Sequence, residues 1–89
     1  MDQFFKIGKL YQNVTKNEAW PLYQVSEKTV NNIKKLGYLS SGDTFVVVAE
    51  SYDSNYIHLT ILFEDGSVYK IMVLKNTKYI QSWFREIVK

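Results

Sequence analysis

The chain has 89 residues, with no cysteine and one histidine, and hydrophobic residues make up 46% of it. This composition excludes a disordered chain, and the length fits one small domain over residues 1–89. The absence of cysteine excludes disulfides, zinc–thiolate sites and a thiol nucleophile, and it favours a reducing cytoplasm. The longest apolar run, residues 45–49, is far shorter than the ~20 residues of a membrane span, so we expect no membrane association.

The formal net charge of +2 is unevenly distributed along the chain. Residues 1–36 carry +3, residues 37–66 carry −5 with no lysine or arginine, and residues 67–89 carry +4. Neighbouring strands can mix these blocks, so the pattern does not by itself predict a charged face. The small total argues against tight binding to a polyanion.

The first half of the chain is predicted to form a strand, a loop and a helix. Alternation indicates a strand over residues 7–14, followed by a loop over residues 15–24 that contains Trp20 and Pro21. Residues 26–37 have helix signals at both ends, with Ser26 as N-cap and Gly37 as the left-handed C-terminal residue.

The second half is predicted to form three strands and a second helix. The strands cover residues 44–50, 56–64 and 67–74, and the last two are joined by the Asp65-Gly66 turn that is typical of hairpins. Residues 78–88 follow the spacing of an amphipathic helix. Asn76 or Thr77 is its predicted cap.

These elements predict an α+β fold. A strongly bent antiparallel sheet of about four to five strands would carry one helix in its first long loop and a second helix at the C-terminus. The expected interior residues are Ile33, Leu36, Val46, Val48, Ile57, Leu59, Ile61, Phe63, Ile71, Val73, Ile80, Phe84 and Ile87.

Residues that could perform chemistry are few. His58 is interpreted as a half-exposed strand histidine rather than a general base. The Asp53-Ser54-Asn55 segment is interpreted as a polar turn, because it lacks the remaining ligands of a calcium loop. The sequence contains no phosphate-binding glycine loop, nucleophile elbow or dinucleotide motif. We therefore expect a protein that is not an enzyme, with no catalytic residues, metal or cofactor.

Several aromatic residues fall outside the expected core, in loops or at the beginnings of strands. Such residues are favoured at protein interfaces, because they provide a large contact area at low entropic cost. The expected partner-binding residues are Trp20, Tyr23, Tyr38, Tyr52 and Tyr56. The alternative for Trp20 is that it closes one end of the core.

Four segments resemble the strands of small SH3-like β-barrels. They are residues 6–11 (KIGKLY), 41–48 (SGDTFVVV), 56–63 (YIHLTILF) and 64–71 (EDGSVYKI). The resemblance implies a bent barrel with residues 15–37 as the long loop after the first strand. The signature of a proline-peptide groove is missing, so binding of PxxP peptides is not implied. The layout is also similar to small accessory proteins of tailed phages, some of which bind and inhibit host proteins, including defence proteins.

The leading hypothesis is a non-catalytic protein-interaction module, with a phage-encoded inhibitor of a host protein as its specific form. One alternative is a weak binder of single-stranded nucleic acid or nucleotides that uses a surface of tyrosines and lysines. The other is a small homo-oligomeric structural protein that uses an exposed sheet edge.

Overall fold

The computed structural model describes residues 5–30, 33–75, 80 and 82–88, and it is built mainly from β-strands. In chain order, the described strands are β1 (Leu10–Asn13), β2 (Trp20–Pro21), β3 (Tyr38–Leu39), β4 (Thr44–Tyr52), β5 (Tyr56–Leu62), β6 (Val68–Leu74) and β7 (Phe84–Glu86).

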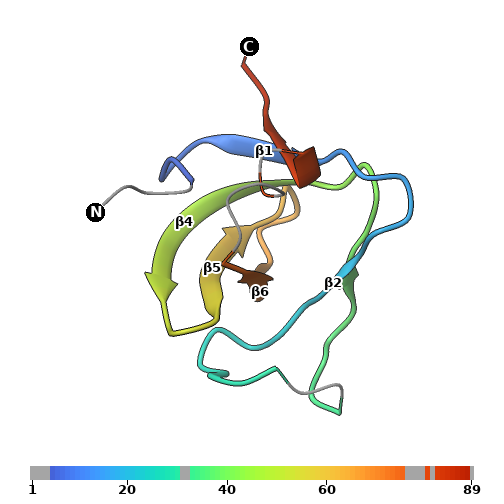
Figure 1. Ribbon diagram of the computed structural model, residues 1–89. Helices are drawn as coiled ribbons and strands as arrows, with labels where there is room; N and C mark the ends of the chain where they lie inside the picture. Colours follow the sequence, from blue (N-terminus) through green and yellow to red (C-terminus); the bar gives the residue numbers. More distant parts are fainter. Residues whose placement is uncertain (1–4, 31–32, 76–79, 81, 89) are drawn as a thin grey trace.

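Five strands form an antiparallel sheet in the order β6-β5-β4-β1-β7, and β2 pairs with β3 in a separate two-stranded ribbon. In Figure 1, β4 curves around β5, β1 lies across the beginning of β4, and β2 lies on the opposite side of the molecule from β4. The expected Asp65-Gly66 turn joins β5 to β6, and Gly66 has the positive φ of 90° that makes glycine the favoured residue there.

A β-bulge divides β4 into two parts. The register with β5 shifts between Val47 and Ala49, so that one extra residue of β4 is accommodated at this point. Val47 is fully buried before the bulge, whereas Val48 and Ala49 are both exposed. A bulge changes which side of the sheet each later residue faces, and it bends the strand.

The core lies on the inner face of the curved sheet. Its aliphatic part comes from alternate residues of the three long strands: Val47, Ile57, Leu59, Ile61, Ile71 and Val73. Its aromatic part joins elements distant in sequence, since Phe84 of β7 contacts Phe5, Trp20 and Phe45 with ring centroids 4.7 to 5.7 Å apart. Edge-to-face and tilted ring pairs of this kind stabilise the closure of the sheet.

A buried asparagine ties the end of β1 to its surroundings. The Asn13 side-chain amide donates hydrogen bonds to the carbonyls of Glu18 (3.0 Å) and Leu39 (3.4 Å). Its carbonyl oxygen accepts from the amide (3.1 Å) and the hydroxyl (2.6 Å) of Thr15. Asn13 is fully buried, and these bonds satisfy the polar groups that burial removes from water.

The expected α+β class is wrong, because the described residues form a sheet and contain neither of the two expected helices. Within residues 26–37, the described backbone forms turns and loop, and Leu36 and Gly37 exchange hydrogen bonds with Leu22 of 2.6 and 2.9 Å. Helix signals at the two ends of this segment are local, and pairing with a distant segment overrides them.

The second expected helix, residues 78–88, is overturned by β7, whose backbone pairs with β1. Ile80, Ser82 and Trp83 have helical backbone, while the proposed caps Asn76 and Thr77, with residues 78, 79 and 81, lie outside the described residues. Within the described part of the chain, no helix has the length and apolar character needed to cross a membrane.

Six of the expected interior residues are not fully buried. Ile33, Leu36 and Val48 are 91%, 52% and 41% exposed. Val46, Phe63 and Ile87 are only half-buried. For β4 the wrong face was expected, because a nearly continuous apolar strand contains no alternation that identifies its buried side.

The two neighbouring valines of β4 test this face assignment. We expect Val47→Ala to lower the free energy of unfolding by about 2 kcal/mol, because it removes buried apolar groups and leaves a cavity. Val48→Ala should change it by less than about 0.5 kcal/mol, as is usual at exposed positions. Urea unfolding of the two variants measures both values, and an equal or larger loss in Val48→Ala would contradict the assignment.

Candidate interaction surface

An apolar row crosses the outer face of the five-stranded sheet. Val68 pairs with Leu62, Leu62 with Val46, and Val46 with Leu10. The amide of Ile87, just after β7, donates a 2.8 Å hydrogen bond to the carbonyl of Leu10. Their chain neighbours Tyr11, Phe45 and Ile61 are buried on the inner face, and side chains alternate along a strand, so the row faces outward.

Part of this row is hollowed into a groove of about 520 Å³. Leu10, Val46, Leu62 and Ile87 line it together with Phe45 and Phe63, and Thr44 and Glu64 supply its polar lining. The four row residues are half-buried, and Val68 beside them is 45% exposed. An outward apolar surface that crosses a whole sheet is the kind of feature that marks an interaction site.

A second, polar row runs beside the apolar one. Gln12 of β1 pairs with Thr44 of β4 on one side and with Arg85 of β7 on the other. Glu64, at the turn after β5, lies at the opposite end of the groove from β7. Glu64 and Arg85 are both exposed. The outer face therefore has an acidic end and a basic end.

Beyond Val68, the outer face of β6 is covered by the chain itself. At the edge of the sheet, Tyr23 and Lys70 exchange two backbone hydrogen bonds, each 2.9 Å long, so this segment pairs along β6. The Lys70 ammonium, itself buried, donates to the backbone carbonyl of Glu27. Burial lowers the pKa of Lys70, and the nearby Glu27 carboxylate opposes this shift. Among the described residues, this cover stops before Val68, which is 45% exposed.

The single histidine holds the β4–β5 turn. His58 Nε2 lies 2.6 Å from Asp53 Oδ2, and the other carboxylate oxygen accepts from the amides of Asn55 (2.8 Å) and Tyr56 (2.7 Å). His58 is 8% exposed, so the expectation of a half-exposed histidine is wrong. Within the described residues, its Nδ1 atom is buried and has no hydrogen-bond partner. The ring therefore braces the β4–β5 turn.

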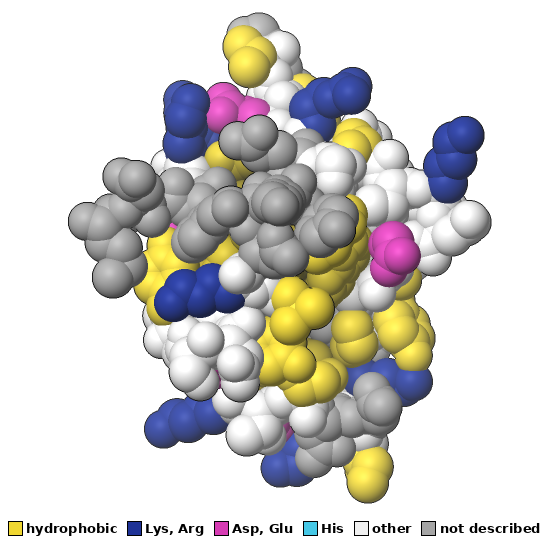
Figure 2. Space-filling view, in the orientation of Figure 1, with side chains coloured by type: hydrophobic (Ala, Val, Ile, Leu, Met, Phe, Trp, Pro, Cys, Tyr) yellow, Lys and Arg dark blue, Asp and Glu magenta, His cyan; other side chains and the backbone are white. Residues whose placement is uncertain are grey.

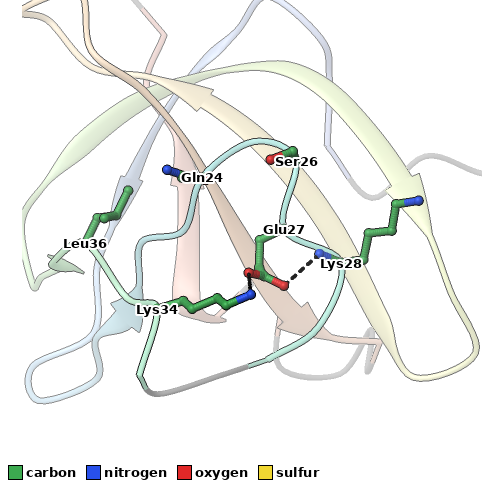
Figure 3. Close-up of a pocket in the computed structure, with 6 residues that line it drawn as sticks. All are labelled: Gln24, Ser26, Glu27, Lys28, Lys34 and Leu36. Atoms are coloured by element: carbon green, nitrogen blue, oxygen red, sulfur yellow. Dashed lines mark hydrogen bonds and ion pairs between the residues drawn. The ribbon is translucent and has the colours of Figure 1, made fainter.

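A polar pocket is formed by the segment expected to be helical (Figure 3). It has a volume of about 580 Å³ and is lined by Gln24, Ser26, Glu27, Lys28, Lys34 and Leu36. Glu27 lies at its centre, 3.6 Å from the Lys34 ammonium and 3.2 Å from the Lys28 amide. Burial opposes ionisation of Glu27, but hydrogen bonds from the Thr29 and Lys28 amides and the charge of Lys34 lower its pKa overall. The charges of this pocket are thus largely satisfied internally.

The five aromatic residues expected to bind a partner do not form one surface. Trp20 and Tyr23 are buried, and Trp20 packs against Trp83 and Phe84 in the core. The alternative that Trp20 closes the core therefore matches its position. Neither side chain is presented to a partner.

The other three tyrosines are more accessible: Tyr38 lies on β3, whereas Tyr52 and Tyr56 flank the β4–β5 turn. Tyr38 is 47% exposed and its ring is covered by the Lys35 ammonium, 4.8 Å from the centroid. Tyr52 packs against the core and has the Lys75 ammonium 5.5 Å from its ring, and Tyr56 is half-buried. In Figure 2, hydrophobic side chains gather near the centre of the visible face, but they adjoin residues that are not described, so we assign no site there.

The apolar row is thus the surface that sequence reasoning missed. Its members are ordinary strand residues, and Val46 and Ile87 were expected inside. The sequence does contain one signal for it. The side chains of residues 56–62 alternate between the two faces of a strand, so Leu62 lies on the other face from Ile61. Within the described residues, no cluster of three or more histidine, aspartate or glutamate side chains could hold a metal ion.

The Asp53 carboxylate makes the free energy of unfolding depend on pH in the acid range. The hydrogen bond from His58, followed by those from the Tyr56 and Asn55 amides, lowers the pKa of Asp53 from 3.8 to about 2. Its stabilising effect is therefore complete above pH 4 and is lost as pH falls toward 2. We expect Asp53→Asn to be less stable than the natural chain at pH 6, with a difference that shrinks as pH falls through this window. Urea unfolding across pH measures it, and a difference independent of pH would contradict the assignment.

Comparison with known proteins gives no family for this chain. No family model, curated protein or solved structure matches it. The similarity to SH3-like barrels and to phage accessory proteins therefore stays a prediction from the sequence. Function has to be inferred from the chain's own residues and from their arrangement in space.

Proposed function

We propose that this chain is a non-catalytic protein-interaction module that binds a polypeptide through the apolar row Val68, Leu62, Val46, Leu10 and Ile87. The observation that carries the proposal is the continuity of this row across neighbouring strands. Each member contributes a side chain that a partner could remove from water, at roughly 25 cal/mol per Å² of apolar surface.

The backbone beneath the row favours binding. Four of its members lie on hydrogen-bonded sheet strands, and Ile87 is joined to Leu10 by a backbone hydrogen bond. Little conformational entropy is then lost when a partner docks, in contrast to a surface built from mobile loops. The groove along the row provides a depression into which a protruding side chain of the partner fits.

The cellular setting is part of the proposal. We place the module in the cytoplasm because a chain without cysteine gains nothing from an oxidising compartment. Inhibition of a host protein by a phage-encoded chain stays a prediction from the similarity of the layout to phage accessory proteins.

Photo-crosslinking in cells tests the proposed surface. A photoreactive amino acid replaces Leu62 in one variant and Ile33, which is 91% exposed and distant in sequence from every row residue, in a control. We expect a covalent protein adduct from position 62 and none, or a much weaker one, from position 33. Equal labelling at the two positions, or none at either, would overturn the proposal.

Nucleic-acid binding is the second candidate, and one observation favours it. Lys35 lies over Tyr38 and Lys75 over Tyr52, so cations and aromatic rings occur together. Bases stack on aromatic rings in binders of single strands, but here a base would have to displace each lysine. If this function is correct, fluorescence titration with single-stranded DNA and RNA should give binding that weakens with salt. A flat titration at low salt would remove it.

A further inference from the structure

We propose that the polypeptide bound by the apolar row is a second copy of this chain, in a twofold-symmetric dimer with the two outer faces in contact. This inference rests on the proposed function, because it names the partner of the same surface. It follows from the order of residues along the row and from the charges at its two ends.

The row is self-complementary under a twofold axis. Val46, on β4, is the middle member of the row, with two apolar residues on each side. An axis in the interface, parallel to β4 and passing by Val46, reverses the order of the row in the second copy. Leu62 then faces Leu10 of the second copy, and Val68 faces Ile87 of the second copy. Apolar residues meet apolar residues throughout, as an isologous interface requires.

The charged residues beside the apolar row favour the arrangement in which the row of the second copy runs in the reverse order. Glu64 lies toward the β5–β6 end of the face and Arg85 toward the β7 end. Reversal brings Glu64 toward Arg85 of the second copy, and symmetry repeats the pairing. An axis along the row would instead place the polar rows of the two copies on opposite sides of the apolar row, and Glu64 would have no Arg85 of the second copy beside it. Opposite charges in register therefore favour the axis parallel to β4.

The size of the row indicates a weak dimer. Four strand spacings of about 4.8 Å give the row a length of roughly 19 Å along the sheet. Because the core lies on the inner side of the curved sheet, the outer face is convex, and the contact is closest at Val46 and its two neighbours in the row. A contact of this size lies at the small end of specific interfaces, so dilution should dissociate it. The segment around Glu27, which the Lys70 ammonium attaches to β6, limits the contact on that side.

Sedimentation equilibrium over a concentration series tests the association. We expect the mass to rise from 10.5 kDa toward twice that value as concentration increases. Val46→Asp should remain monomeric, and Ile33→Asp, which places the same charge on an exposed apolar residue elsewhere, should dimerise normally. Circular dichroism checks that both variants are folded. A single-chain mass at millimolar concentration would overturn the proposal.

The absence of natural cysteine allows a direct test of the axis. In the proposed dimer the two copies of residue 46 approach each other, so Val46→Cys should form an intermolecular disulfide under mild oxidation. Ile33→Cys is the control for random collision and is the more exposed position. We expect the Val46→Cys dimer to form faster. If the Val46→Cys disulfide forms at the same rate as the Ile33→Cys disulfide, or more slowly, the proposed position of the twofold axis is wrong.

Charge reversal tests the direction without altering the core. Glu64→Arg and Arg85→Glu should each weaken dimerisation, by roughly tenfold, because each replaces two attractive pairs by repulsive ones. The double variant should restore it, whereas additive weakening would contradict the pairing.

The outcomes also separate this inference from the proposed function. If the protein is monomeric but the photoreactive group at position 62 captures a different protein, the interaction function stands and the second copy is wrong. If it captures only another copy of the chain, with an adduct of twice the chain mass, both stand. If it captures nothing and the protein is monomeric, both fail.

Discussion

The double pairing of β4 is the constraint on which the rest of the structure depends. Its first residues pair with β1 on one side, while residues 46–52 pair with β5 on the other. A single regular strand could not serve both neighbours around a small core without bending. The bulge between Val47 and Ala49 supplies that bend, and it turns Glu50 toward the Phe5 amide, from which it accepts a 3.1 Å hydrogen bond.

The same pairing decides which surface remains for function. Once Phe45 and Val47 face the core, Val46 must face outward, and the register places Leu10 and Leu62 beside it. Because their side chains face outward, these three apolar residues do not belong to the core. Their outward placement is therefore what connects the fold of this chain to an interaction function.

Buried polar groups fix the positions of segments that do not belong to the regular strands. Asn13 links β1 to β3 and to the loop before β2, and the His58–Asp53 pair holds the β4–β5 turn. Lys70 attaches the segment around Glu27 to β6. Asn13–Glu18 and Asp53–His58 are each five residues apart, whereas Asn13–Leu39 and Lys70–Glu27 are 26 and 43 residues apart, so local patterns do not predict the longer links.

Local patterns in the amino-acid sequence were sufficient to locate the strands over residues 44–50, 56–64 and 67–74 and the glycine turn between the last two, because these features depend on neighbouring residues. The fate of residues 26–37 and 84–86, the buried face of β4 and the apolar row depended on contacts between distant segments. A helix cap is worth about 1 kcal/mol, whereas pairing with an open strand edge satisfies several backbone groups at once. Only the tertiary structure could decide between them, since the competing partners lie up to 75 residues away in the sequence (Tyr11 and Glu86).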